Sequence, residues 1–316
     1  MIEIQHLTKK YGQIKAVDNL NFIVQKGEIL GFLGPNGAGK STTMNIITGY
    51  ISSSEGSVKV CGYDILESPY EVKKRIGYLP EQPPLYTDMI VKDYLHFTGE
   101  LKHVEKNRLK SQIADIMEIV KIGDVRNRLI NNLSKGYKQR VGLAQSLIGN
   151  PEVLILDEPT VGLDPMQIIE IRRLIKALGK EHTIILSSHI LPEVSAVCDR
   201  LVIINKGKIA AVDTPENLAK GFSTSSKFLI RIEGPQDSVE VILGNIPGVK
   251  SIEIKSLTEN NIWDYIVETE ENAEVKRPLF FELAKNGYPI FELKSLGLTL
   301  EEIFLQVTTK EEGVGH

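Results

Sequence analysis

A glycine-rich segment at residues 34–42, GPNGAGKST, contains the residue types that hold a triphosphate. Its glycines let successive backbone N–H groups face one anion, and a helix beginning near Lys40 adds its N-terminal dipole. Lys40 is placed to reach the β- and γ-phosphates, the Ser41 hydroxyl to ligate Mg²⁺, and Thr42 to approach the α-phosphate. The pattern is that of a P-loop. The candidate phosphate-binding residues are Gly34, Pro35, Asn36, Gly37, Ala38, Gly39, Lys40, Ser41 and Thr42.

Two adjacent carboxylates, Asp157 and Glu158, follow the apolar run at residues 153–156. Adjacent residues of a strand point to opposite faces, so we expect the two acids to have different tasks. Asp157 is expected to hold the Mg²⁺ shell, and Glu158 to face a water molecule that attacks the γ-phosphate. Together with the P-loop, the pair predicts hydrolysis of a nucleoside triphosphate.

Short β-branched runs alternate with longer helical patterns over the first 220 residues, which is typical of an α/β fold with a mostly parallel sheet. Each predicted strand is almost continuously apolar, as strands covered on both faces are. The clearest strands are Ile29–Leu33, Val153–Asp157, Thr183–Ser187 and Leu201–Asn205.

Residues 83–150 lack such a strand and instead show helical patterns. The predicted helices are Val91–Leu101, Glu105–Val120 and Ser134–Gly149. We therefore expect a helical subdomain inserted between the P-loop and the two carboxylates.

A domain boundary is predicted near residues 222–226, within the small, polar segment GFSTSS at residues 221–226. From residue 226 onward the chain has 9 Lys and Arg against 16 Asp and Glu, unlike the preceding part. The later elements are predicted in the order strand, helix, strand, strand, helix, strand, which indicates a small α+β ferredoxin-like domain. A last helix is predicted from Thr299, with Glu302 completing a capping box. We expect domains at residues 1–221 and 226–310.

Composition excludes some classes of function. The 316 residues have a formal charge of −4, with no excess of Lys and Arg for general binding of a nucleic-acid backbone. The opening residues lack the apolar stretch of a signal peptide, and no apolar run approaches the roughly 18 residues that span a bilayer. We therefore expect the chain in the cytosol. The two cysteines, Cys61 and Cys198, are too few for a disulfide framework and are expected to pack in the interior.

Further motifs in the first 220 residues resemble the ATP-binding cassette of ABC transporters. They occur in the order of that family, between and around the P-loop and the Asp157-Glu158 pair. The matching segments are Tyr11 in KKYGQIKAVD, Gln82 after the run IGYL, Leu133-Ser134-Lys135-Gly136-Tyr137, Gly162-Leu163-Asp164-Pro165, and His189 after LSS. The resemblance implies a P-loop NTPase fold with a mixed sheet and an inserted helical subdomain.

The resemblance also implies roles for single residues. Tyr11 stacks on the adenine ring, and Gln82 contacts the metal or its water and reports γ-phosphate occupancy to the helical insertion. His189 bonds the γ-phosphate and keeps Glu158 and the water in register, and Asp164 lies in a loop that crosses to a partner subunit. The implied catalytic residues are Glu158, His189, Lys40 and Gln82, and the metal-binding residues are Ser41, Gln82 and Asp157.

The segment at residues 133–137 suggests a partner. A serine at a helix start followed by glycine presents a hydroxyl and free N–H groups to an anion. In the family this segment, with Ser134 and Gly136, completes the nucleotide site of a second cassette, so the resemblance implies a dimer, here a homodimer, with ATP between the copies. Lys135 and Tyr137 depart from the common LSGGQ pattern. Lys135 is expected to face solvent or another phosphate, and no role of the usual glutamine carries over to Tyr137.

The type of cassette follows from the KGY variant, the appended small domain and the closing run at residues 298–304, LTLEEIF. These resemble the ATPase subunits of ABC-2-type exporters. The resemblance implies hydrolysis of ATP with Mg²⁺ at the cytoplasmic face of the membrane, beside separate membrane-spanning permease subunits and without nucleic acid. The alternative is a soluble ABC ATPase acting on the ribosome or DNA. A single cassette without a long inserted coiled coil argues against it.

Overall fold

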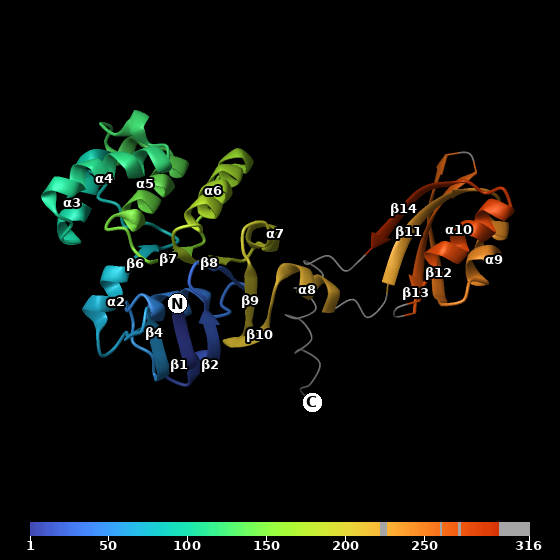
Figure 1. Ribbon diagram of the computed structural model, residues 1–316, viewed down its shortest axis with the longest axis horizontal. Coiled ribbons are helices and arrows are strands. Elements are labelled where there is room, and N and C mark those ends of the chain that lie inside the picture. Colours follow the sequence, from blue (N-terminus) through green and yellow to red (C-terminus); the bar gives the residue numbers. More distant parts are fainter. Residues whose placement is uncertain (222–225, 260, 271–272, 297–316) are drawn as a thin grey trace. The chain divides into compact units, whose positions relative to one another are not determined.

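The computed structural model describes residues 1–221, 226–259, 261–270 and 273–296. The chain divides into two compact units, one that runs from Met1 to Pro215 and one that begins at Glu216 (Figure 1). This division falls after the first residue of helix α8 (Pro215–Gly221). The sequence places the boundary after that helix, and its domain ranges remain a prediction. The helix predicted from Thr299 lies outside the described residues.

The first unit contains a four-stranded antiparallel sheet in the order β2-β1-β4-β5. Its apolar residues alternate with polar ones, which gives the sheet one buried and one exposed face. The continuously apolar runs predict only the strands of a mostly parallel sheet, so this antiparallel sheet is an addition to the predicted fold. Its strands are β1 (Ile2–Tyr11), β2 (Ile14–Val24), β4 (Glu55–Val60) and β5 (Tyr63–Asp64).

A six-stranded sheet in the order β10-β9-β3-β8-β7-β6 carries the motif segments. The strands from β9 to β6 in this order form four parallel pairs, and β10 is antiparallel to β9, so the predicted mixed sheet is confirmed. Every residue of β3, β7 and β8 is buried, which explains their continuous apolar sequences. The strands are β3 (Ile29–Leu33), β6 (Ile76–Leu79), β7 (Val153–Asp157), β8 (Thr183–Ser188), β9 (Arg200–Asn205) and β10 (Lys208–Asp213).

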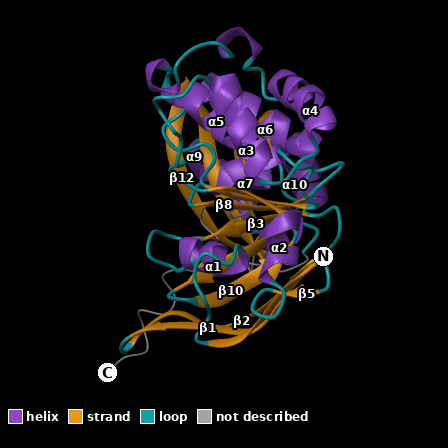
Figure 2. Ribbon diagram, turned by 90° about the vertical axis from the view of Figure 1, so that its left-hand side faces the viewer, coloured by secondary structure: helices purple, strands orange, loops and turns teal. Residues whose placement is uncertain are grey.

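Helix α1 (Lys40–Ile47) directly follows the P-loop and lies in the core between the two sheets (Figure 2). Its residues Met44, Ile46 and Ile47 belong to one apolar cluster with residues of both sheets. The phosphate-binding segment is therefore held between the buried strand β3 and a buried helix. The other helices of this unit outside the insertion are α2 (Pro69–Arg75), α6 (Pro165–Leu178) and α7 (Leu191–Ser195).

The predicted helical insertion is present. It consists of α3 (Val91–Leu101), α4 (Lys106–Ile119) and α5 (Lys135–Leu147), with short 3₁₀ turns between α4 and α5. Residues 83–150 are all described, and they form no strand, only an isolated bridge between Ile90 and Leu129. Both ribbon views place these helices together, away from β1 and β2 (Figures 1 and 2).

The second unit forms an antiparallel sheet in the order β12-β13-β11-β14, crossed by helices α9 and α10. This order and the element sequence confirm the predicted ferredoxin-like fold. One face of the sheet packs on both helices through a core that includes Ile230, Tyr265 and Leu279. The elements are β11 (Ser226–Glu233), α9 (Gln236–Gly244), β12 (Val249–Glu259), β13 (Ile262–Thr269), α10 (Lys276–Lys285) and β14 (Ile290–Leu296).

Several side chains outside the site follow the sequence expectations. Cys198 is buried, and Cys61 is half-buried and packs against the core of the first unit. In β14 (Ile290–Leu296), apolar and polar residues alternate less regularly near Ile290, because the register of this strand against β11 shifts between Arg231 and Ile232.

Candidate functional site

The P-loop is shaped by glycines that have no room for a side chain. A Cβ on Gly34 would lie 2.4 Å from the Ile204 carbonyl oxygen, and one on Gly39 would lie 2.5 Å from the Ala16 carbonyl oxygen. Gly39 also has a φ of 106° at the N-cap of α1, a conformation that disfavours any other residue. The loop geometry is therefore fixed by close backbone packing on β2 and β9.

Two cavities adjoin the P-loop. The smaller, of about 490 Å³, is the phosphate side, and the larger, of about 820 Å³, extends toward the helical insertion. Ser41 and Glu81 line both cavities. Of the predicted P-loop residues, the smaller cavity is lined by Asn36, Gly37, Gly39, Lys40, Ser41 and Thr42. Gly34, Pro35 and Ala38 do not line it.

Lys40 projects from the first turn of α1 and is 6% exposed. Its ammonium donates a hydrogen bond of 2.8 Å to the Gly34 carbonyl, and it lies 3.6 Å from the Glu158 carboxylate. Loop and carboxylate together hold the cation at the floor of the smaller cavity. A buried cation in this position attracts the phosphates of a nucleotide.

Asp157 and Glu158 face different cavities, although not for the reason expected from the sequence. Strand β7 ends at Asp157, and Glu158 lies beyond it with a φ of 48°. A left-handed turn, and not strand alternation, therefore directs the two carboxylates apart. Asp157 lines the larger cavity, while Glu158 lines the smaller one beside Lys40.

His189 lies at the end of β8 and joins Glu158 in the smaller cavity. Its Nδ1 atom is 2.9 Å from Oε2 and 3.0 Å from Oε1 of the Glu158 carboxylate. The histidine is partly exposed while the carboxylate is buried, so the ring covers the acid from the solvent side. The structure thus brings Lys40, Glu158 and His189 together.

Ser187, the residue of β8 opposite Asp157, holds the turn between the two acids. Its hydroxyl donates to an Asp157 carboxylate oxygen and accepts a hydrogen bond from the Glu158 backbone N–H at 3.1 Å. Sequence reasoning gave it no role. A hydroxyl at the end of an otherwise apolar buried strand was the available signal.

Two further acids were missed. Glu193 is 6% exposed in α7 and accepts a hydrogen bond from the Thr160 hydroxyl, which ties the loop after Glu158 to the body of the unit. Glu81 precedes Gln82 and lines both cavities. Their positions in the sequence follow no pattern that distinguishes these two acids from ordinary surface carboxylates.

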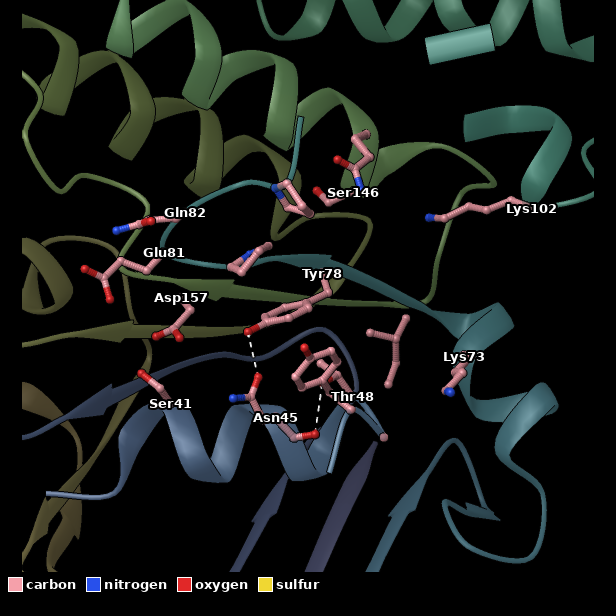
Figure 3. A pocket seen from close by; sticks show the side chains of 16 residues that line it. Ser41, Asn45, Thr48, Lys73, Tyr78, Glu81, Gln82, Lys102, Ser146 and Asp157 are labelled. Carbon is pink, nitrogen blue, oxygen red and sulfur yellow. Dashed lines mark hydrogen bonds between the residues drawn. The ribbon is translucent and has the colours of Figure 1, made fainter. Parts of the chain in front are cut away.

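At the end nearest the P-loop, the larger cavity is lined by side-chain oxygen atoms that could ligate a metal ion (Figure 3). Ser41, Gln82 and Asp157 line this end, and the Tyr78 hydroxyl donates to the Asn45 side chain at 3.2 Å deeper in the cavity. Hydroxyl, amide and carboxylate oxygens suit Mg²⁺, which needs few protein ligands when phosphates supply others. The residues present therefore fit the expected metal ion.

The opposite side of the larger cavity is basic, with Lys73 and Lys102 (Figure 3). Lys102 donates a hydrogen bond of 2.8 Å to the Ile148 carbonyl. Burial lowers the pKa of the Lys102 amine to about 8 because the charged form loses hydration.

The tips of α5 and α6 carry the remaining motif residues. Ser134 is exposed and caps α5 by accepting a hydrogen bond from the Tyr137 N–H. The Asp164 carboxylate caps α6 by accepting a 2.9 Å hydrogen bond from the Gln167 N–H. Ser134, Gly136 and Asp164 do not line either P-loop cavity of their own chain.

Tyr11, at the end of β1, is 52% exposed and also lies outside both cavity linings. The Lys9 ammonium lies 5.3 Å from the centre of its ring. One aromatic face is thus used within the chain, and the exposed part of the ring remains accessible.

No helix among the residues that the structure describes has both the length and the apolar character to cross a membrane. A family model described as ABC transporter matches residues 17–161. The chain is 33% identical over 317 residues to the uncharacterized ABC transporter ATP-binding protein YhcH of Bacillus subtilis (strain 168), across 99% of this chain and 98% of that protein.

Two further likenesses concern the cassette. The bacitracin transport ATP-binding protein BcrA of Bacillus licheniformis is 41% identical over 211 residues, covering 66% of this chain and 68% of that protein. A dimeric structure of MJ0796, a bacterial ABC transporter cassette, matches with a TM-score of 0.63 and 25% identity, covering 68% of this chain and 98% of that one. Likeness along nearly the whole length of one relative, together with the P-loop geometry, leads to one conclusion: this chain belongs to the ABC transporter family as an ATP-binding subunit, and it is an ATP hydrolase.

Proposed function

We propose that this chain is the ATPase subunit of an ABC-2-type exporter, bound at the cytoplasmic face of the cell membrane to separate membrane-spanning permease subunits. The KGY signature variant and the appended ferredoxin-like unit support this type. One relative is named for bacitracin transport, which supports a transport role. The relatives compared above carry transporter names, so the alternative of a soluble ATPase acting on the ribosome or DNA is not favoured.

The observation that carries the ATPase part of this proposal is the separation of the two acids at the end of β7. Asp157 and Glu158 serve two cavities that meet at Ser41. One carboxylate is thereby available to a metal ion and the other to a water molecule. Hydrolysis of a phosphoanhydride needs both functions at the same phosphate.

Glu158 accepts the proton as water attacks the γ-phosphorus. The water oxygen forms a bond to phosphorus while the bond to the bridging oxygen of the β-phosphate breaks, which releases ADP and phosphate. His189 orients the Glu158 carboxylate and bonds the γ-phosphate, and Lys40 balances the charge of the β- and γ-phosphates. The short Glu158–His189 distance supports this arrangement.

Ser41, Gln82 and Asp157 would hold Mg²⁺, which neutralises charge on the β- and γ-phosphates when bound. Tyr11 stacks on adenine through its exposed ring, an apolar contact that does not depend on the base's polar groups. The P-loop N–H groups and Thr42 complete the contacts within one chain.

A second copy of the cassette completes the site. Ser134 is exposed outside the cavities of its own chain, where it can meet a nucleotide held by another, and Gly136 lies two residues further on, packed on Gln167. Asp164 belongs to the loop that crosses to this partner. The dimeric form of MJ0796 supports a paired cassette. Two ATP molecules then lie in the interface of a homodimer, and the dimer reopens after hydrolysis.

Gln82 lies where nucleotide occupancy can reach the helical insertion. It shares the larger cavity with Ser41 and Asp157 on one side and with Gln145 and Ser146 of α5 on the other. A shift of Gln82 toward a bound metal ion therefore changes a wall that α5 also forms. Movement of α3–α5 against the permease subunits transmits the closure of the dimer.

The test is Glu158→Gln, which keeps the shape of the side chain and removes the base. We expect ATP turnover to fall by at least about a hundredfold, with ATP affinity retained and an ATP-dependent dimer visible by light scattering. Glu181→Gln, at an exposed site, is the matched control. Normal turnover in the first variant contradicts the role of Glu158, and a monomer at saturating ATP contradicts the shared interface.

A further inference from the structure

Lys135 occupies the position of the signature segment where a glycine is usual, and its side chain contacts the loop before α6. A Cβ built on Gly162 would lie 1.9 Å from the Lys135 Nζ, 2.8 Å from Cε and 3.2 Å from Cδ. The lysine side chain therefore lies along the backbone of Gly162. A glycine at position 135 has no atoms that can make this contact.

The contact fits Gly162 alone. This residue has a φ of 70°, which disfavours other residues, and a Cβ there would displace the end of the lysine side chain from its observed position. The same helix tip also packs on α6, because a Cβ on Gly136 would lie 2.4 Å from the Gln167 Oε1 atom. Two glycines thus let the tip of α5 and the segment around Gly162 approach each other closely.

The loop that receives Lys135 begins at the proposed base. The Val161 N–H donates to the Glu158 carbonyl at 3.2 Å, and the Leu163 N–H donates to the Thr160 carbonyl at 3.2 Å. Val161 lines the smaller cavity beside Glu158. A continuous set of contacts therefore runs from the chain's own nucleotide cavity through Gly162 to Lys135, the neighbour of Ser134.

We propose that Lys135 is a positioning residue that links the chain's own nucleotide cavity, through Gly162, to the Ser134 tip that serves the second cassette. This inference rests on the proposed homodimer. When the loop after Glu158 moves, the lysine stem moves the α5 tip with it. The occupancy of one ATP site thereby changes the serine presented to the other, which makes the two sites cooperative.

The contact is made by the end of the side chain, from Cδ to Nζ, and it involves no charged partner. Among the residues that the structure describes, the Lys135 ammonium makes no ion pair within 4.0 Å and no hydrogen bond. Packing of the methylene groups on the glycine backbone needs length and shape but no charge. A methionine at position 135 therefore preserves the link, and an alanine removes it.

The experiment compares Lys135→Ala, Lys135→Met and the control Lys138→Ala in the full chain. Lys138 lies one turn along the same helix and has no part in the contact. We expect a Hill coefficient for ATP hydrolysis above 1 in the unaltered chain, in Lys135→Met and in Lys138→Ala. In Lys135→Ala it falls to about 1 with ATP affinity of the monomer unchanged, because only the coupling is lost.

A second variant perturbs the contact from the other side. Gly162→Ala should lower cooperativity in the unaltered chain, and its effect should be smaller in the Lys135→Ala background because the clash partner is gone. Independent effects of the two substitutions overturn the proposal. A Hill coefficient in Lys135→Ala equal to that of the unaltered chain also overturns the proposal. A Hill coefficient of about 1 in Lys135→Met overturns it as well, because the effect would then depend on the charge of the lysine.

The dimer is checked separately in the Glu158→Gln background. Suppose that Glu158→Gln with Lys135 retained dimerises with ATP, while Lys135→Ala shows unchanged cooperativity. This result overturns the link through Lys135 and leaves the proposed function in place. Failure of that variant to dimerise with ATP, whatever residue occupies position 135, contradicts the proposed homodimer itself.

Discussion

The Nδ1 atom of His189 lies 2.9 Å from the Glu158 carboxylate, and the same carboxylate lies 3.6 Å from the Lys40 ammonium on its other side. The acid is thus held between a ring at the solvent side and a cation at the floor of the cavity. We expect the ring to affect kcat, because it orients the acid. We expect the cation to affect the affinity for ATP, because it attracts the phosphates.

We predict that His189→Ala lowers kcat for ATP hydrolysis by about a hundredfold, the lower end of effects seen for acid–base groups. The ATP dissociation constant should change less, because the P-loop contacts remain. Steady-state kinetics and calorimetry separate the two. His96→Ala, at an exposed histidine of α3, is the control. A variant with unchanged kcat would show that the contact with Glu158 has no bearing on turnover.

Lys40→Ala should weaken ATP binding by about tenfold to a hundredfold, the range for loss of one charge-assisted hydrogen bond. Isothermal titration calorimetry measures the change directly. Lys59→Ala, at an exposed position of β4, should bind ATP as the unaltered chain does. Equal affinities in both variants would remove the P-loop lysine from the nucleotide contacts.

Tyr11→Ala should weaken ATP binding by about tenfold, since stacking of a base on an aromatic ring contributes about 1–3 kcal/mol. Tyr11→Phe should retain the affinity because the ring face, and not the hydroxyl, makes the contact. Binding of inorganic triphosphate, which lacks the base, should be the same in all three proteins. If the phenylalanine variant binds ATP as weakly as the alanine variant, stacking is not the contact.

Lys102 predicts a dependence of stability on pH. Burial lowers the pKa of its amine to about 8 in the folded state, while the unfolded chain keeps the ordinary pKa of 10.5. Between these values the unfolded state binds more protons, so this group makes the free energy of unfolding rise with pH. Relative to Lys102→Met, the unaltered chain should gain about 1 kcal/mol per pH unit above pH 8.

Chemical denaturation at pH 7 to 10 measures this difference. Lys92→Met, at an exposed lysine of α3, should show no change with pH relative to the unaltered chain. A constant gap between the unaltered chain and Lys102→Met would mean that the amine is hydrated in the folded protein.

The sequence predicted those parts of the protein whose physics is local. The P-loop could be found because its glycines are required by a tight turn, and the ferredoxin-like order could be found because each strand had a hydrophobic period of its own. Strand β14 was the weakest, since a register shift beside Ile232 interrupts its alternation.

The contacts that were missed join distant parts of the chain. Ser187 meets Asp157 only because β7 and β8 are adjacent in the sheet, and Lys135 meets Gly162 only because α5 and α6 begin side by side. The separation of Asp157 and Glu158 was predicted, but the reason was wrong. A strand pattern could not reveal that the strand ends between them and that Glu158 adopts a positive φ.

That positive φ restricts what evolution and mutagenesis can place at position 158. A left-handed backbone disfavours β-branched side chains whatever their chemistry, and it tolerates asparagine and aspartate better than valine or threonine. Substitutions there should fall into two tiers, folded but inert proteins and proteins that lose thermal stability as well. The backbone conformation at position 158 thus limits which residues the fold tolerates there, and this limit is separate from the need for an acid in hydrolysis.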